Sequence, residues 1–193
     1  MDEQQLIALV RDGDEDAFNQ IVCAYKDKIV NYLTQVTGDY QKAVDLSQET
    51  FLRVYFKADK YKPIAPLSSW IYAIASNLAK TEIKKRRRMS LVSIEELPPT
   101  VDLSTPGGES SDSGLSANLR RALDRLNPRY RIPIVLKDVE GYSQEEIAGI
   151  IQRPVGTVKA RISRGRAMLK KTLESARREF VGQAKTEMLD ERF

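Results

Sequence analysis

The sequence predicts an all-α protein of two small helical domains joined by a flexible linker, with a helix-turn-helix in the second domain. Apolar residues recur at the three- and four-residue spacing of helices through most of the 193 residues, and few stretches alternate as strands do. Residues 91–114 break this pattern with prolines, paired glycines and serines, and they contain no Lys or Arg. Because such a segment buries little apolar surface, we expect it to separate the two domains as an acidic linker.

The N-terminal domain, residues 1–90, is expected to contain four helices. They cover about 2–11, 14–37, 39–60 and 68–88. Gly38 is well placed to cap the second helix at its C-terminus, and a loop with two prolines, 61–67, precedes the fourth helix. Ser68 or Ser69 is the expected N-cap of that helix. Cys23 lies within an apolar helical pattern, so we expect it in the core.

The fourth helix of this domain combines an apolar stripe with a polar face. The polar face carries Trp70, Ala73, Asn77, Lys80, Thr81 and Lys84, and the helix closes with five consecutive cations, Lys84, Lys85, Arg86, Arg87 and Arg88. Cations bind the phosphate backbone, an aromatic ring stacks on bases, and amide or hydroxyl groups contact a displaced base. This face therefore predicts a contact with melted or single-stranded DNA, although Trp70 fits the core equally well.

The C-terminal domain, residues 115–178, is expected to end in a helix-turn-helix. Helices are expected at about 115–126 and 128–139, followed by a helix that starts with the capping box Ser143 and Glu146. Pro154 fits the first turn of the last helix, and Gly156 is small enough to lie near the contact between helices. The apolar face of the last helix comprises Val155, Val158, Ile162, Gly165, Leu169 and Leu173. Its remaining faces are rich in cations and hydroxyls suited to a DNA major groove.

Charge and composition narrow the function further. Residues 61–91 and 119–178 are basic and alternate with acidic segments, which indicates two separate contacts with nucleic acid. The chain has no histidine and one cysteine, so zinc sites, His-based catalysis and intramolecular disulfides are not expected. We expect no catalytic residue, no metal and no cofactor. Without a signal-peptide run or about 18 consecutive apolar residues, we expect a cytoplasmic protein that does not insert into membranes.

Three motifs resemble those of the extracytoplasmic-function (ECF) sigma factors, a group of the sigma-70 family. They are DLSQETFLRVY at 45–55, LSSWIYAIASNLAKTEIKKRRR at 67–88, and LNPRYRIPIVLKDVEGYSQEEIAGIIQRPVGTVKARISRGRAMLKK at 126–171. The resemblance covers nearly the whole chain. It implies a transcription initiation factor, not an enzyme, that binds core RNA polymerase through the β′ clamp helices and the β flap. It also implies control by an anti-sigma factor, with the chain monomeric when free or in a heterodimer with that factor.

The resemblance also assigns roles to individual residues. It implies polymerase binding by Asp45, Gln48, Glu49 and Leu52. It implies contact with the minus-ten DNA element by Trp70, Asn77, Lys80, Thr81, Lys84, Arg86, Arg87 and Arg88. It implies contact with the minus-thirty-five DNA element by Thr157, Lys159, Ala160, Arg161, Ser163 and Arg164. The loop 61–69 would hold an extruded base. Ala73 stands where relatives often have arginine, and Ala160 where a hydroxyl residue is common, so the promoter sequence does not follow from the resemblance.

Three other functions compete with this interpretation. A stand-alone helix-turn-helix regulator would need a sensor domain, and residues 1–90 have no such pattern. A sigma mimic that binds only an anti-sigma factor would have lost the cations at 84–88 and 159–171, which this chain keeps. A DNA-cleaving enzyme would need a nucleophile or a carboxylate metal site, and the best carboxylate pair, Asp45 with Glu49, has no third ligand. The role of the tail 179–193 stays open.

Overall fold

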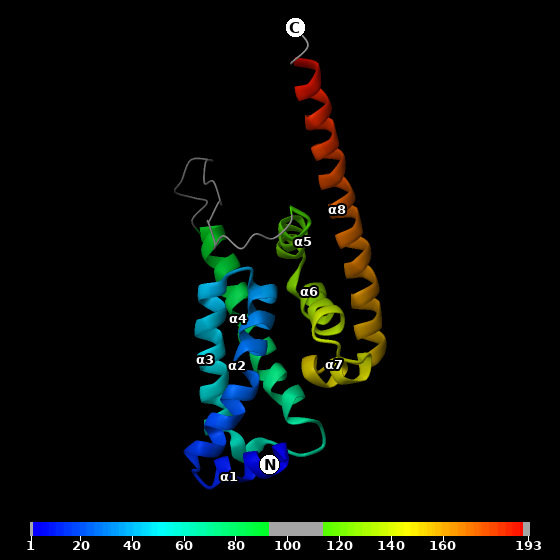
Figure 1. Ribbon diagram of the computed structural model, residues 1–193. Helices are drawn as coiled ribbons and strands as arrows, with labels where there is room; N and C mark the ends of the chain where they lie inside the picture. Colours follow the sequence, from blue (N-terminus) through cyan, green and yellow to red (C-terminus); the bar gives the residue numbers. More distant parts are fainter. Residues whose placement is uncertain (1, 93–113, 191–193) are drawn as a thin grey trace.

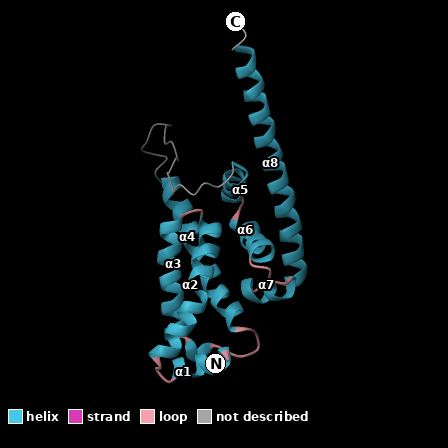
Figure 2. Cartoon of the chain, in the orientation of Figure 1, coloured by secondary structure: helices cyan, strands magenta, loops and turns pink. Residues whose placement is uncertain are grey.

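The structure, a computed structural model, describes residues 2–92 and 114–190, and these residues form helices joined by short loops (Figure 2). In chain order the elements are α1 (Glu3–Arg11), α2 (Glu15–Thr37), α3 (Tyr40–Phe56), a 3-10 turn (Ala58–Lys60), α4 (Leu67–Val92), α5 (Gly114–Arg125), α6 (Pro128–Ile134), a π-helical turn (Val135–Val139), α7 (Gln144–Ile151) and α8 (Val155–Asp190). The predicted all-α class is confirmed. The linker prediction falls largely on 93–113, which lie outside the described residues.

Helices α1 to α4 pack as one group around α2 (Figure 1). The buried face of α2 includes Ile29, Tyr32, Leu33 and Val36, each fully enclosed. Asp14 accepts a hydrogen bond from the backbone N–H of Ala17 at 2.9 Å and so caps the start of α2. Gly38 ends the helix with φ of 74°, a left-handed conformation that glycine adopts without steric cost, as the sequence predicts.

Two expectations for this group were wrong. Cys23 is exposed, because it lies two residues from both Ile21 and Tyr25, about 200° around the helix from either buried side chain. The fourth helix begins at Leu67, so Ser68 and Ser69 are helical residues and not caps. Leu67 is 1% exposed, and this burial draws the first turn inward.

Helices α5 to α8 form the second group, and the caps predicted for α6 and α7 are confirmed. The Asn127 side chain accepts the backbone N–H of Arg129 at 3.1 Å, with Pro128 at the first position of α6. The capping box of α7 is present, because Glu146 N–H donates to Ser143 at 3.1 Å and Ser143 N–H donates to Glu146 at 2.8 Å.

Details of α8 differ from the expectation. Val155 is 39% exposed rather than buried, and it is the first residue of the helix. No atom lies within 4 Å of a Cβ built on Gly156, so this glycine is not at a helix contact. The helix also continues past residue 178 to Asp190, so the expected tail is in large part an extension of α8 (Figure 1).

The two helical groups pack against each other. Buried residues of α2 and α4 belong to the same apolar core as Ile132, Leu136, Ile147 and Val158. Helix α4 contacts α7 and α6, and α2 contacts α5 and α6. The described residues therefore form one closed arrangement in which both α2 and α4 contact the C-terminal helices.

Candidate nucleic-acid interface

Most of the predicted polar face of α4 is accessible. Asn77, Lys80, Thr81 and Lys84 are exposed, as are the cations at 86–88. The Thr81 hydroxyl donates to the backbone carbonyl of Asn77 at 2.9 Å. Trp70 is half-buried, with its ring 5.4 Å from the ring of Tyr61, so part of the indole packs on the core and part remains accessible. The structure thus brings these side chains to one side of α4.

The loop before α4 is braced at its start. Arg11 of α1 donates from Nε to the carbonyl of Ala58 at 2.8 Å and from a terminal nitrogen to the carbonyl of Tyr61. The Tyr61 hydroxyl donates to the carbonyl of Ala65 at 2.8 Å across the loop. Ile64 at its tip is 87% exposed. Because α4 begins at Leu67, the expected loop 61–69 is shortened to 61–66.

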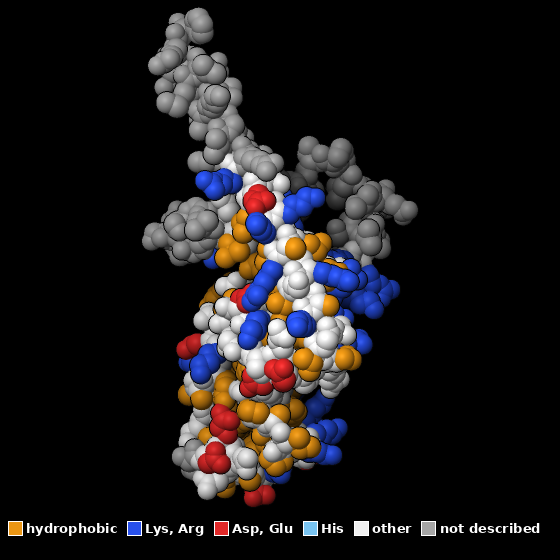
Figure 3. All heavy atoms as spheres, turned by 90° about the vertical axis from the view of Figure 1, so that its right-hand side faces the viewer, with side chains coloured by type: hydrophobic (Ala, Val, Ile, Leu, Met, Phe, Trp, Pro, Cys, Tyr) orange, Lys and Arg blue, Asp and Glu red, His pale blue; other side chains and the backbone are white. Residues whose placement is uncertain are grey.

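Helix α8 turns one face to its own domain and leaves a second face open. Val158, Ile162, Gly165 and Leu169 are buried as predicted. The predicted DNA contacts lie elsewhere on the helix: Lys159, Ala160, Ser163 and Arg164 are exposed, and Thr157 and Arg161 are partly buried. Cations also occupy much of the surface around α8 in Figure 3.

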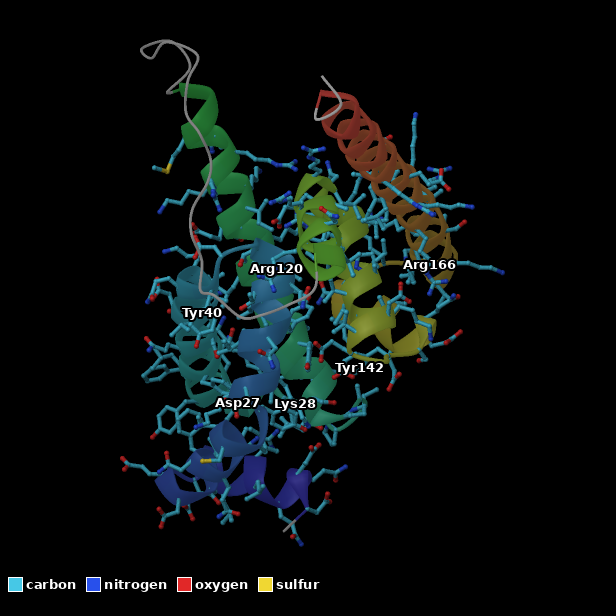
Figure 4. All side chains as sticks on the ribbon, turned by 45° about the horizontal axis from the view of Figure 1, so that its top comes forward. Asp27, Lys28, Tyr40, Arg120, Tyr142 and Arg166 are labelled. Atoms are coloured by element: carbon cyan, nitrogen blue, oxygen red, sulfur yellow. The ribbon has the colours of Figure 1, made fainter. Side chains whose placement is uncertain are left out.

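Gly165 and Arg166 set how α8 lies on the rest of its domain. A Cβ at Gly165 would collide with Cδ1 of Ile134 and lie 3.1 Å from Cβ of Tyr130, so a larger residue here would require these side chains of α6 to shift. Next to it, Arg166 makes a two-pronged ion pair with Asp138 in the π-helical turn, and the Nε to Oδ2 distance is 3.1 Å (Figure 4 labels Arg166). The direction of the open face is therefore fixed by packing and by charge.

The predicted polymerase contacts gather on the outer face of α3. Asp45 and Gln48 are exposed, Glu49 is partly exposed, and Leu52 is 52% exposed. Asp45 pairs with Lys42 at 3.2 Å, and Glu49 pairs with Arg53 at 2.8 Å. Phe56, one turn beyond Leu52, is 75% exposed and was missed from the sequence. Its spacing of four from Leu52 was the available signal.

Tyr72 of α4 connects the two helical groups. The Tyr72 ring lies 5.0 Å from the ring of Tyr32 on α2 and 5.2 Å from that of Tyr142, which precedes α7. The Tyr72 hydroxyl donates to the carboxylate of Glu140. Burial raises the pKa of Glu140, while this hydrogen bond lowers it. Sequence reasoning missed Tyr72, because a period of 3.6 residues cannot tell which domain a buried side chain faces.

Arg131 of α6 makes a second connection between the domains. Its side chain is buried, and Nη1 donates to the carbonyl of Val36, at the end of α2, at 2.8 Å. The same nitrogen lies 3.1 Å from Oδ1 of Asp124, and Nη2 donates to the carbonyls of Asp124 and Leu126. Burial lowers the pKa of Arg131 and the Asp124 charge opposes that effect, so the guanidinium stays charged. Gly38 lies close by, where an added Cβ would collide with the Asp124 carboxylate.

Residues predicted to contact separate DNA elements line one cleft between the domains. Asn77, Lys80 and Lys84 of α4 form one wall, and Arg161 of α8 belongs to the opposite wall. Residues from the start of α6 and from the turn between α7 and α8 complete the lining. Of the predicted minus-thirty-five contacts only Arg161 lines this cleft, so one edge of the α8 surface faces α4 while Lys159, Ser163 and Arg164 stay exposed.

Two family models match the chain, one in each helical group. The model for sigma-70 region 2 matches residues 21–89, and the model for sigma-70 region 4 matches residues 116–169. The ECF RNA polymerase sigma factor SigW of Bacillus subtilis is 36% identical over 176 residues, which cover 86% of this chain and 94% of SigW. The chain belongs to the ECF sigma factors. The RNA polymerase sigma-H factor of Pseudomonas aeruginosa is 31% identical over 92% of this ECF sigma factor and 96% of its own length.

Solved structures agree with this assignment at the level of the fold. The sigma factor RpoE of Bartonella quintana, in complex with the anti-sigma factor NepR, superposes with a TM-score of 0.64 at 26% identity, over 81% of this chain and 96% of its own. CnrH, in complex with the cytosolic domain of CnrY, superposes with a TM-score of 0.65 at 22% identity, over 90% of this chain and 97% of CnrH. Among residues 2–92 and 114–190 of this ECF sigma factor, no helix is long and apolar enough to cross a bilayer.

Proposed function

We propose that this ECF sigma factor directs core RNA polymerase to promoters with separate minus-ten and minus-thirty-five elements and helps open the DNA. One observation carries the proposal: each of the two segments that match sigma-70 regions bears an accessible cationic helix face, on α4 and on α8. The protein then acts as a specificity subunit and catalyses no reaction itself.

The two domains divide the recognition of the promoter. Residues 1–90 bind the minus-ten element through the α4 face, from Trp70 to Arg88, and the loop 61–66 receives an extruded base. Residues 115–178 bind the minus-thirty-five duplex through the start of α8, with residues 91–114 as the linker. Supporting this division, the α4 face combines an aromatic ring with cations, whereas α8 presents small and cationic side chains that fit a major groove.

Core polymerase binds the outer face of α3 in the N-terminal domain. Asp45, Gln48, Glu49 and Leu52 contact the β′ clamp helices, and exposed Phe56 extends this surface by one turn. The C-terminal domain contacts the β flap. An acidic and apolar α3 face suits a protein partner and disfavours DNA, so polymerase and promoter do not compete for one surface.

Promoter binding requires the domains to separate. Elements named for positions 25 base pairs apart lie about 85 Å apart along B-DNA, at ~3.4 Å per base pair. In the closed arrangement Lys80 and Arg161 line the same cleft, so one duplex cannot reach both surfaces. Because the related RpoE was solved in complex with the anti-sigma factor NepR, we propose that an anti-sigma factor holds this chain closed in the cytoplasm. The free protein is then monomeric, and the inhibited form is a heterodimer.

Run-off transcription with bacterial core polymerase on a pooled promoter library tests the proposal. The wild-type protein is compared with Asn77→Ala, Arg161→Ala and the control Arg177→Ala, which removes an exposed cation of α8 outside the proposed contacts. We expect new starts at a shared two-part sequence, with Asn77→Ala weakening selection at one half and Arg161→Ala at the other. Binding of duplex DNA without new starts would favour the stand-alone regulator instead.

A further inference from the structure

We propose that the cleft between α4 and the C-terminal helices binds a nucleoside polyphosphate, and that this ligand holds the two domains closed. The cleft has a volume of about 300 Å³. This is the lower end of the range for small-molecule sites, which suits a ligand of nucleotide size that leaves part of its surface in solvent. Its walls come from both domains, so a bound ligand would bridge them.

The first argument is charge. Six cations line the cleft: Lys80, Lys84 and Arg87 from α4, and Arg129, Arg153 and Arg161 from the C-terminal domain. The lining includes no Asp or Glu, and none of the six takes part in an ion pair among the described residues. Like charges on opposite walls repel, so the closed arrangement carries an electrostatic cost. A polyanion between the walls converts this repulsion into attraction.

The second argument is the apolar part of the lining. Ile132 and Pro133 are buried, and Ile83 and Ile151 are partly buried, so together they offer an aliphatic surface beside the cations. A flat nucleobase or ribose packs on such a surface, whereas a bare polyphosphate gains nothing from it. The side-chain amides of Asn77 and Asn127 also line the cleft and can hydrogen-bond a base edge. This combination favours a nucleoside polyphosphate over an inorganic one.

Occupation of the cleft has a consequence that rests on the proposed function. Five residues of the lining are also proposed promoter contacts: Asn77, Lys80, Lys84, Arg87 and Arg161. A ligand that binds the closed form but not the open form shifts the population toward the closed form, and promoter DNA shifts it back. Nucleotide and promoter therefore antagonise each other. The cleft would make initiation sensitive to the nucleotide pool without any change in anti-sigma factor.

Titration calorimetry on the full-length protein, without polymerase or DNA, tests the binding itself. The probes are ATP and inorganic tripolyphosphate. We expect one saturable site that binds ATP more tightly than tripolyphosphate. The double variant Arg129→Gln/Arg153→Gln removes two cleft cations that have no proposed promoter contact, and it should weaken ATP binding about tenfold or more. Arg177→Gln, an exposed cation outside the cleft, should leave it unchanged.

Energy transfer between two fluorophores tests the closing. One dye is attached to Cys23, which is exposed and the only cysteine of the chain, and the other to Ser175→Cys on α8. We expect ATP to raise the fraction of molecules in the closed form, seen as a change in energy transfer. The change should be smaller in the double arginine variant. Circular dichroism of each variant confirms that a lost response is not lost folding.

Several outcomes would overturn the proposal. Absence of saturable ATP binding, or an equal loss in Arg177→Gln, refutes the site. Equal affinity for ATP and tripolyphosphate refutes the nucleoside part. A short single-stranded oligonucleotide that saturates the cleft where ATP does not would assign the cleft to nucleic acid alone. Because these measurements need no polymerase, their failure leaves promoter-directed transcription intact, and failure of transcription leaves them intact.

Discussion

Replacement of Arg131 by methionine measures what this buried guanidinium contributes to stability. The side chain is 5% exposed and donates to the carbonyl of Val36 at 2.8 Å, to Asp124 Oδ1 at 3.1 Å and to the carbonyl of Leu126 at 3.2 Å. Methionine keeps much of the apolar length but makes none of these bonds. The Val36 and Leu126 carbonyls then lose a charged donor inside the protein.

The size of the effect follows from the burial of the partners. Removing one member of a buried, hydrogen-bonded ion pair costs roughly 3–5 kcal/mol. The Asp124 side chain is 41% exposed and can regain water, which places the expected loss near the lower limit, about 3 kcal/mol. With a urea dependence of about 2–3 kcal/mol per molar, the unfolding midpoint should fall by about 1 M.

Urea unfolding followed by circular dichroism is the assay, with Arg125→Met as the matched control because Arg125 is an exposed cation at the end of α5. The control should stay within about 0.5 kcal/mol of the wild type. Arg131→Lys should fall between the two, since an ammonium cannot reach carbonyls on both sides as the planar guanidinium does. A loss below about 0.5 kcal/mol for Arg131→Met would refute the reasoning, because the desolvation of the guanidinium would then cancel its bonds.

Three further predictions concern packing, pH and a hydroxyl. Gly165→Val should lower the unfolding free energy by roughly 1–3 kcal/mol, because the new side chain collides with Ile134, and thermal unfolding should report it. Burial raises the pKa of Glu140 above its ordinary value of 4.5, so the folded protein holds this proton more tightly than the unfolded chain does. Stability from this group is therefore greatest below pH 4.5 and falls as the pH rises through the folded pKa; Glu140→Gln should remove that fall from a stability profile recorded from pH 4 to 8. Tyr72→Phe should lower the unfolding free energy by about 1 kcal/mol. It should also move the fall in stability to higher pH, because the hydrogen bond from Tyr72 keeps the pKa of Glu140 lower and its removal raises that pKa; unchanged profiles would contradict both statements.

Helix caps could be predicted from the sequence, whereas contacts between segments far apart in the chain could not. The cap at Gly38 and the capping box of Ser143 depend on residues within one turn, so their side chains alone determine them. Arg131 looked like one more cation, since nothing nearby in the chain indicates that the end of α2 supplies its acceptor. Cys23 was misplaced because an apolar residue type does not by itself determine which face of a helix it occupies.

The candidate site was likewise predictable in its parts but not in its assembly. The exposed positions of α4 and α8 follow from the 3.6-residue period, and the structure leaves them accessible, as for Lys80 and Arg164. That Lys80 and Arg161 line one cleft depends on how two domains pack across an intervening segment. Periodicity within one helix contains no information about that packing. The roles of these residues at the promoter remain predictions for the transcription assay.

Because α8 is long, a small rotation of the C-terminal domain displaces the far end of this helix by a large distance. Its 36 residues, at ~1.5 Å per residue, extend about 54 Å from the turn that carries the proposed groove contacts to Asp190. A rotation of the C-terminal domain by only about 20° would therefore sweep the far end through roughly 19 Å, while atoms near the pivot move by a few ångströms. A probe fused after α8 would amplify small changes in domain orientation, and a bulky fusion there would sit far from the DNA.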